Sequence, residues 1–133
     1  MGYRYSVEIL TEWDIVAARQ LGRNEAKEVG FGTVDQARIT TAISELARNI
    51  YLYAGKGKIE IERISEGGAF GIIIIASDEG PGIPDVRKVM EDGFSTSGGL
   101  GAGMPGVKRL MDDFKIETVL GEGTVIKATK WIR

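Results

Sequence analysis

The amino-acid sequence predicts an α+β fold, a two-layer sandwich in which helices cover one face of a mixed β-sheet. Apolar residues recur at helical spacing through residues 33–55, whereas an uninterrupted apolar run of strand length occupies residues 70–76. Segments of strand-like composition, bounded by glycine, lie on both sides of these two stretches. The 133 residues show no internal repeat and no linker, so we expect residues 1–133 to form a single domain.

The first predicted elements are a strand and a helix. Residues 3–10 are rich in apolar residues that alternate in part, which is typical of a strand. Thr11 and Asp14 have the spacing of a helix start. We therefore predict a helix over residues 11–28, ended by Gly30.

The second predicted helix covers residues 33–55. Its apolar residues at i, i+4, i+7 and i+11 form one stripe, made of Ile39, Ile43, Leu46 and Ile50. Thr33 and Gln36 are spaced like a capping box at its start, and Gly55 suits the position just past its end.

The second half of the chain is predicted to supply most of the sheet. From Ile59 onward apolar and polar residues alternate, which indicates a strand with one buried face. A hairpin turn at 66–68 leads into the apolar run at 70–76, predicted to be a central strand covered on both faces. Trp13 and Trp131 are expected in the core or at its edge. The remaining predicted elements are a short helix at 85–90, an irregular loop at 91–104, a helix from Pro105 to Asp113, and strands at 114–120 and 124–132 joined by a tight turn at 121–123.

Composition argues against several classes of function. The formal net charge is −2 and no stretch gathers Lys and Arg into a basic face, so we expect no nucleic-acid partner. The apolar runs are too short for a membrane span and no signal pattern opens the chain; without cysteine, the cytoplasm is the expected location. Because His and Cys are both absent, a general base must be a carboxylate, Lys or Tyr, and a bound metal must be a hard cation such as Mg²⁺ or Ca²⁺.

Glu45 and Asn49 lie one turn apart in the second helix. At roughly 100° per residue both fall about 80–120° from the centre of the apolar stripe, so we expect them to flank the core and to face a pocket. An ion pair of Glu45 with Arg48 or with Arg38 is the alternative explanation for the carboxylate. Arg48 itself is expected to point away from the core stripe.

Two glycine-rich stretches are candidates for binding an anion. Asp78-Glu79-Gly80-Pro81-Gly82 follows the predicted central strand, where aspartate and glycine are also ordinary turn residues. Gly99-Leu100-Gly101-Ala102-Gly103 precedes the helix at Pro105. Closely spaced glycines let backbone N–H groups approach an anion, and a helix N-terminus adds a favourable dipole. A flexible linker is the alternative for this second stretch.

A G-x-G-x-x-G spacing in the same region is not a dinucleotide fingerprint. Gly101, Gly103 and Gly106 match the letters, but the polar residues 92–98 precede them where the fingerprint needs a strand. The chain also has no G-x-x-x-x-G-K-[ST] phosphate loop. Both of these nucleotide-binding folds are therefore excluded.

The chain resembles the GHKL ATPase superfamily in the order of four features. These are the Glu45–Asn49 helix, the stretch at 78–82, the stretch at 99–103 and Gly121-x-Gly-Thr124. The resemblance narrows to the RsbT-type serine/threonine protein kinases of the bacterial stressosome and covers nearly the whole chain. The segments that carry it are TEWDIVAARQLGR, residues 31–57, GPGIPD and residues 88–113. It implies the GHKL (Bergerat) ATP-binding fold.

The resemblance also implies a role for each matching residue. Asn49 would bind Mg²⁺ between the phosphates of ATP, and Glu45 would accept the proton of the substrate hydroxyl. Asp78 would accept the hydrogen bond of the adenine amino group, with Thr124 supporting that end. The matching glycines are Gly80 and Gly82 against the adenine, and Gly99, Gly101 and Gly103 around the phosphates.

One departure concerns the ATP lid, which falls on residues 85–98. The sporulation kinase relatives carry an arginine before the second glycine box, where this chain has Gly99. Lys56, Arg87, Lys88 or Lys108 would supply a cation instead. Lys108 is favoured because it follows the glycine box on the next helix, with a solvated surface lysine as the alternative.

The function implied by the resemblance is phosphorylation of serine or threonine on STAS-domain antagonist and scaffold proteins of a stressosome. The kinase would then switch partner and activate a metal-dependent protein phosphatase in stress signalling. A nucleotide-gated partner-binding module with little intrinsic chemistry is the alternative. Glu45 beside Asn49 argues against that alternative, because binding alone does not need a base.

Overall fold

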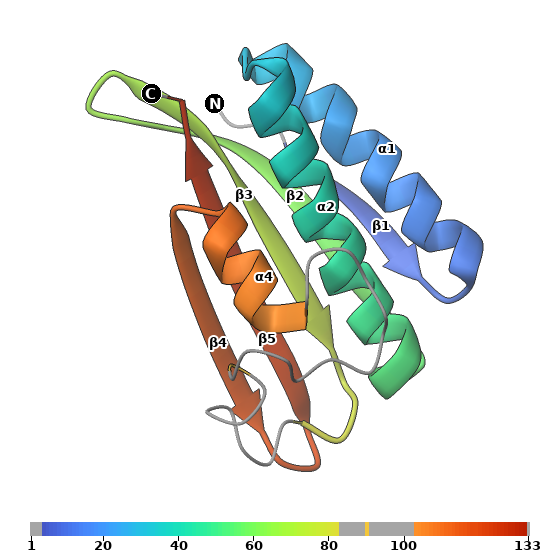
Figure 1. Cartoon of the computed structure of the whole chain (residues 1–133). Coiled ribbons are helices and arrows are strands. Elements are labelled where there is room, and N and C mark those ends of the chain that lie inside the picture. Colours follow the sequence, from blue (N-terminus) through green and yellow to red (C-terminus); the bar gives the residue numbers. More distant parts are fainter. Residues whose placement is uncertain (1–3, 83–89, 91–102, 133) are drawn as a thin grey trace.

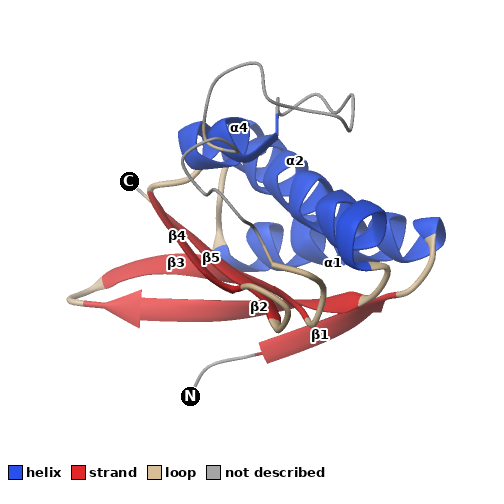
Figure 2. Ribbon diagram, turned by 90° about the horizontal axis from the view of Figure 1, so that it is seen from below, coloured by secondary structure: helices blue, strands red, loops and turns tan. Residues whose placement is uncertain are grey.

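The chain forms two layers, with the described helices packed on one face of a five-stranded sheet (Figures 1 and 2). The computed structural model describes residues 4–82, 90 and 103–132. The strands are β1 (Arg4–Ile9), β2 (Gly57–Glu66), β3 (Ala69–Asp78), β4 (Asp113–Val119) and β5 (Gly123–Trp131), and the helices are α1 (Glu12–Val29), α2 (Thr33–Asn49), the π-helix η1 (Ile50–Ala54) and α4 (Gly103–Leu110). The predicted two-layer α+β fold is thus confirmed.

Helix α1 begins and ends as the sequence predicts. Oδ2 of Asp14 accepts hydrogen bonds from the backbone N–H groups of Leu10 and Thr11, each at 2.8 Å. These contacts stabilise the helix start, where backbone N–H groups have no partner within the helix. At the other end Gly30 adopts a φ of 112°, a left-handed conformation that glycine takes without steric cost.

Helix α2 begins at Thr33, as predicted, but its N-cap differs from the expected one. Gly32 is its N-cap, and the side chain of Gln36 donates a hydrogen bond to the Phe31 carbonyl at 2.8 Å. The expected capping box between Thr33 and Gln36 is therefore wrong. Beyond its last turn α2 widens into η1, and Gly55, at a φ of 83°, follows as predicted.

The sheet has the strand order β1-β2-β3-β5-β4, and all four neighbouring pairs are antiparallel. The expected mixed sheet is wrong in this respect. Strands β3 and β4 do run in the same direction, and α4 crosses the sheet face before β4 begins (Figure 1). Strand β5 then returns between them and pairs with both. Its insertion removes the parallel neighbour that such a crossover usually creates.

Strand β3 lies in the middle of the sheet, as predicted, but only one of its faces is covered. Ile72, Ile74 and Ala76 are buried, whereas Ile73 and Ile75, which alternate with them, are half-buried. The expectation of cover on both faces is wrong because the described helices all lie on one side (Figure 2).

Helix α4 occupies Gly103–Leu110 rather than the predicted Pro105 to Asp113. Nζ of Lys130 donates a hydrogen bond to the Leu110 carbonyl at 2.9 Å, and this cation satisfies a carbonyl of the last turn. The helix predicted at 85–90 and the loop predicted at 91–104 fall largely outside the described residues.

The two tryptophans differ in burial. Trp13 is 80% exposed on α1, so its expected place in the core or at the core edge is wrong. Trp131 is half-buried at the end of β5 and lies against Gly71 of β3, but it is not among the described residues that form the core or pack against it, so this prediction is wrong as well.

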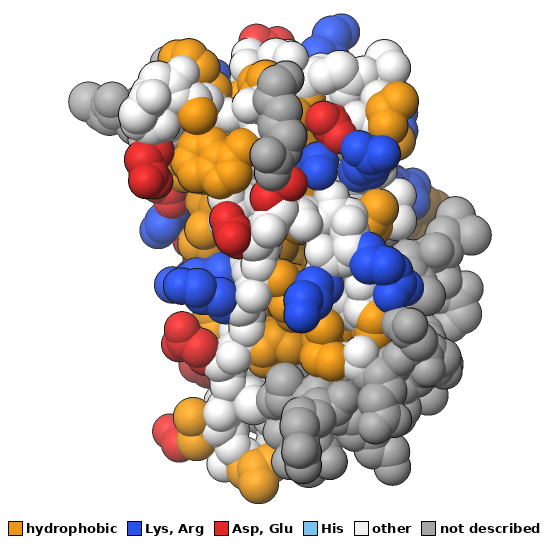
Figure 3. All heavy atoms as spheres, turned by 60° about the vertical axis from the view of Figure 1, so that its left-hand side comes forward, with side chains coloured by type: hydrophobic (Ala, Val, Ile, Leu, Met, Phe, Trp, Pro, Cys, Tyr) orange, Lys and Arg blue, Asp and Glu red, His pale blue; other side chains and the backbone are white. Residues whose placement is uncertain are grey.

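The surface is mixed in character. On the face shown in Figure 3, acidic and basic side chains both occur, with apolar side chains between them. Among the described helices, none combines the length and the apolar character that crossing a bilayer requires.

Candidate active site

Among the predicted site residues that the structure describes, Asp78, Gly80, Gly82 and Thr124 gather at one end of the sheet. Asp78 is the last residue of β3, and its register partners are Gly57 in β2 and Thr124 in β5. The last turns of α2 reach the same end, and η1 continues the helix toward the loop that follows β3 (Figure 1). A methyl group added to Gly80 of this loop would lie 2.7 Å from Cβ of Ala54 in η1. The loop that follows β3 and the π-helix η1, which are far apart in the sequence, therefore pack directly against each other.

Glu45 is buried, with only 1% of its surface exposed. The helical count placed it at the flank of the core, and that expectation is wrong because α4 also packs against α2. The buried arc of α2 consequently includes Thr40, Ser44 and Glu45 as well as the apolar stripe. A carboxylate in such a place needs polar partners to remain charged.

Arg48 is one such partner for Glu45. Its Nη1 atom lies 3.4 Å from Oε1 of Glu45, and its side chain is 32% exposed. The ion pair that the sequence offered as an alternative is therefore present, although Arg48 was expected to point away from the core stripe. Arg38 pairs with Asp35 at 3.0 Å instead. The pairing places a cation beside the predicted base.

Asn49 is half-buried at the end of α2, immediately before η1. Its amide oxygen is a ligand type that Mg²⁺ accepts, and Mg²⁺ typically combines one or two protein ligands with phosphate oxygens and water. No cluster of three or more acidic residues suited to a metal occurs in the described part of the chain. The donor set therefore fits an ion that is held mainly by a nucleotide.

Asp78 is held by the loop that follows it. Its Oδ1 atom accepts a hydrogen bond from the backbone N–H of Gly80 at 2.8 Å. This contact fixes the carboxylate at the edge of the sheet, where Asp78 is half-buried. Gly82 has a φ of 80°, and a methyl group there would lie 2.8 Å from the Val119 carbonyl oxygen. Glycine at these positions lets the loop pack closely against both η1 and β4.

Thr124 is buried beside Asp78 and belongs to a pair of hydroxyl groups. Its Oγ1 lies 3.0 Å from Oγ1 of Thr118 across the β4–β5 hairpin. Thr118 Oγ1 also donates a hydrogen bond to the Gly123 carbonyl at 3.2 Å. The two hydroxyl groups therefore hold each other in fixed orientations.

The second glycine box is described only at its end. Gly103 is buried, has a φ of 73° and opens α4. Gly99 and Gly101, and the lid predicted at 85–98, lie outside the described residues. Lys108 is exposed on α4. Its role as the replacement cation stays a prediction.

Sequence reasoning missed Thr118 as a partner of Thr124, and it offered the ion pair of Glu45 with Arg48 only as an alternative. The i, i+3 spacing of Glu45 and Arg48 was a usable signal, but it permits contact without requiring it. The predicted turn at 121–123 would pair Leu120 with Thr124, whereas the structure pairs Thr118 with Thr124. Their pairing was therefore not readable from the predicted hairpin, because the position of the turn sets every cross-strand partner.

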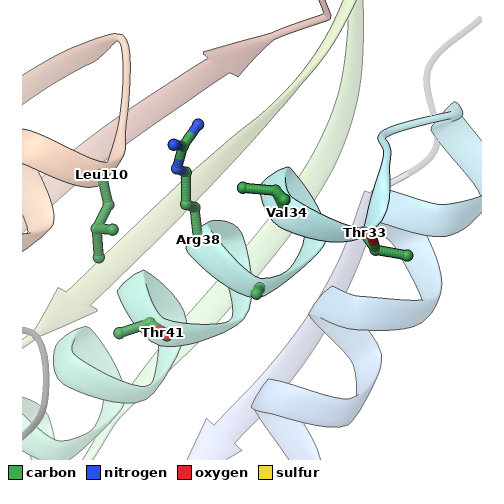
Figure 4. A pocket seen from close by; sticks show the side chains of 6 residues that line it. Thr33, Val34, Arg38, Thr41 and Leu110 are labelled. Carbon is green, nitrogen blue, oxygen red and sulfur yellow. The ribbon is translucent and has the colours of Figure 1, made fainter.

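A separate groove runs between the first half of α2 and the end of α4 (Figure 4). Its lining is mostly apolar and comes from Thr33, Val34, Ala37, Arg38, Thr41 and Leu110. None of these is a predicted site residue. The groove is therefore distinct from the residues gathered around Asp78.

Comparison with known proteins decides the family. The family of histidine kinase-, DNA gyrase B-, and HSP90-like ATPases matches residues 34–132. The chain is 77% identical over 127 residues to the serine/threonine-protein kinase RsbT of Bacillus subtilis (strain 168), covering 96% of each chain. The chain belongs to the RsbT kinase family within these ATPases. It is also 37% identical to the anti-sigma F factor of Caldanaerobacter subterraneus subsp. tengcongensis, over 72% of this chain and 70% of that one.

Two solved structures share the fold of this chain. The structure of the RsbU and RsbW domains of Rv1364c from Mycobacterium tuberculosis matches with a TM-score of 0.64 at 18% identity, and this chain spans 33% of that one. The SiaB–SiaC complex from Pseudomonas aeruginosa matches with a TM-score of 0.56 at 12% identity, covering 98% of this chain and 89% of that one. At these identities the likeness concerns the fold alone. Family membership establishes ATP as the nucleotide that this fold uses.

Proposed function

We propose that this protein transfers the γ-phosphate of ATP to a serine or threonine of STAS-domain proteins, the antagonist and the scaffold of a stressosome. Phosphorylation releases the kinase, which then binds and activates a metal-dependent protein phosphatase. The two complexes compete for one kinase, so the phosphorylation state of the first partner controls the second by mass action. The RsbT resemblance supports this order of events, and we place it in the cytoplasm, where ATP is available.

The observation that carries the kinase proposal is the position of Glu45. Its carboxylate is buried one helical turn before Asn49, at the end of α2 that meets the β3 loop. Binding a nucleotide does not require a carboxylate there, whereas transfer to a hydroxyl group needs an acceptor for the released proton. The geometry therefore favours phosphoryl transfer over a binding module.

In the proposed reaction, the substrate hydroxyl oxygen forms a bond to the γ-phosphorus as the bond to the ADP oxygen breaks. Glu45 orients the hydroxyl group and takes its proton. The transition state is loose, so positioning and charge neutralisation contribute more than a strong base does. A glutamate, whose ordinary pKa is about 4.3, is adequate when the proton is collected late.

The other site residues bind and orient. One carboxylate oxygen of Asp78 accepts the hydrogen bond of the adenine amino group, while the backbone N–H of Gly80 donates a hydrogen bond to the other. Thr124, the register partner of Asp78, supports the adenine end of the site. Asn49 would hold Mg²⁺, which neutralises phosphate charge when bound. Gly103, and by resemblance Gly99 and Gly101, would offer backbone N–H groups to the phosphates.

The test is transfer of labelled γ-phosphate from ATP to a cognate STAS-domain protein, with and without Mg²⁺. Glu45→Gln should keep ATP binding and lose roughly 10²- to 10⁴-fold in transfer rate. Asp78→Asn should lose ATP binding, because the amide presents a donor where an acceptor is needed. Glu28→Gln on exposed α1 and Asp113→Asn on exposed β4 make the same chemical changes outside the site. Both control variants should behave like the wild type.

Three outcomes contradict parts of this proposal. A wild-type protein that binds ATP and partner but transfers no phosphate supports the nucleotide-gated binding module instead. Transfer by Glu45→Gln at the wild-type rate shows that Glu45 is not the base. Transfer that persists fully after removal of divalent cations rules out the role given to Asn49.

A further inference from the structure

Arg48 lies between the two residues on which the proposed reaction depends. It follows Glu45 by one turn and directly precedes Asn49, in the last turn of α2. Its Nη1 is 3.4 Å from Oε1 of Glu45, a carboxylate that is buried, while Arg48 reaches the surface with 32% of its side chain exposed. The guanidinium therefore joins a buried group of the site to the protein surface.

We propose that Arg48 is a positioning residue for phosphoryl transfer, which holds the carboxylate of Glu45 in the orientation that receives the substrate proton. The inference rests on the kinase function proposed above and adds a residue that this function did not require. Arg48 acts through Glu45 and is not given a contact with the nucleotide.

The physical argument begins with the freedom of a glutamate side chain. Its terminal torsion is broad, so a carboxylate without a fixed contact rotates between many orientations. A charged hydrogen-bond donor at Oε1 fixes this rotation and sets the direction of the Oε2 lone pairs. Because a displacement of about 1 Å can reduce an enzymatic rate by about 10²-fold, this orientation affects the rate.

The exposed pair of Arg38 with Asp35 on the same helix is a useful comparison for the pair of Arg48 with Glu45. Arg38 and Asp35 have the same i, i+3 spacing at 3.0 Å, but their side chains are 52% and 33% exposed. Exposed pairs of this kind are loosely held and are screened by water. The pair of Arg48 with Glu45 differs because the Glu45 side chain is 1% exposed, so water reaches this carboxylate far less than it reaches Asp35.

A purely structural role for Arg48 is the competing explanation. A cation in the last turn of a helix interacts favourably with the helix dipole, so its removal lowers helix stability without affecting the chemistry. Melting temperature and catalytic parameters separate the two roles. A structural role lowers the melting temperature and leaves kcat unchanged, whereas a positioning role lowers kcat in protein that is still folded.

The experiment compares Arg48→Ala, Arg48→Gln and Arg48→Lys in the full chain, with melting temperature, ATP Kd, and kcat and KM for a cognate STAS-domain protein. Alanine and glutamine should each lower kcat by roughly 10- to 100-fold while the Kd of ATP stays within about twofold. Lysine should recover much of the rate, because one charged donor at Oε1 suffices. Arg38→Ala, which breaks the matched exposed pair, should leave kcat unchanged.

A double variant tests whether Arg48 acts through Glu45. When two residues act as a unit, removing the second adds little to the loss caused by the first. Adding Arg48→Ala to Glu45→Gln should therefore lower the residual transfer by less than about threefold. Losses that multiply, an unchanged kcat in the folded Arg48 variants, or a fall in ATP affinity alone each overturn the inference. In those cases the wild type still transfers phosphate and the proposed function stands, whereas an inactive wild type contradicts the function itself.

Discussion

The hydroxyl groups of Thr118 and Thr124 form a directed pair, with their oxygen atoms 3.0 Å apart. A carbonyl oxygen can only accept, so Thr118 gives its one proton to Gly123, 3.2 Å away. Thr124 must then donate to Thr118, and its own lone pairs face outward from this contact. An oriented acceptor is thereby created at the residue that pairs with Asp78 across the sheet.

Removing the Thr118 hydroxyl group should release the Thr124 hydroxyl from its fixed orientation, while every residue assigned to the nucleotide keeps its side chain. We predict that Thr118→Val raises the Kd of ATP by roughly 3- to 10-fold, the effect of one net hydrogen bond, measured by titration calorimetry. Thr129→Val makes the same change on β5 at a half-buried position away from Asp78 and should leave the Kd unchanged. An unaltered Kd for Thr118→Val would show that Thr124 needs no orienting partner.

Gly80 is predicted to accept no side chain. Its Cβ would lie 2.7 Å from Cβ and 2.9 Å from Cα of Ala54, so η1 and the loop after β3 would have to separate. We expect Gly80→Ala to weaken ATP binding by more than about tenfold, with overpacking costing roughly 1–3 kcal/mol of folding stability. Gly32→Ala is the matched control, because a Cβ there meets nothing within 4 Å. Equal ATP affinities in both variants would contradict the close packing assigned to this loop.

The sequence predicted the order of the elements because their signals are local. Thr11 with Asp14, and Gly30, act within a few residues, and their predicted positions are confirmed. The turn predicted at 121–123 lies one residue earlier, because β4 ends at Val119 and β5 begins at Gly123. The burial of Glu45 was not predictable in this way. It depends on α4, a segment far along the chain, and a single apolar stripe cannot show a second contact on the same helix.

The strand order of the sheet was likewise not predictable from local signals. A mixed sheet was expected, but which strand lies beside β3 is decided by how β5 folds back. Likewise, five consecutive apolar residues in β3 indicated cover on both faces, although one face of the sheet carries no described helix (Figure 2). The roles given to Asn49 and Lys108 stay predictions of the family resemblance.

The ion pair between Glu25 of α1 and Arg63 of β2 should contribute strongly to stability. Both guanidinium contacts are short, at 2.8 and 3.2 Å, and Glu25 is buried. We predict that Arg63→Met lowers the free energy of unfolding by about 2–4 kcal/mol, because it leaves a buried charge without this partner. Adding Glu25→Leu should recover most of the loss in urea denaturation, since an apolar pair fits such a site.

A control for this prediction is the exposed pair of Arg4 and Glu62, which is equally short at 2.7 Å. Arg4→Met should leave the urea midpoint nearly unchanged, because water screens an exposed pair. If Arg4→Met and Arg63→Met shift the midpoint equally, burial is not what makes the Glu25 pair important. If the double variant is no more stable than Arg63→Met alone, the buried charge is not the cause of the loss.

Asp14 should make the start of α1 sensitive to acid. The backbone N–H groups of Leu10 and Thr11 hold the pKa of this carboxyl group below its ordinary value of 3.8. A lowered pKa in the folded state stabilises the fold above the ordinary value, and this contribution is lost as pH falls through the folded pKa. The melting temperature of Asp14→Asn should therefore lie below that of the wild type at neutral pH, and the difference should shrink as pH falls below 3.8. Glu12→Gln removes a carboxylate from the same turn and should show a smaller difference. A gap between wild type and Asp14→Asn that stays constant from neutral pH to strongly acidic pH would mean that the charge of Asp14 does not support the helix start.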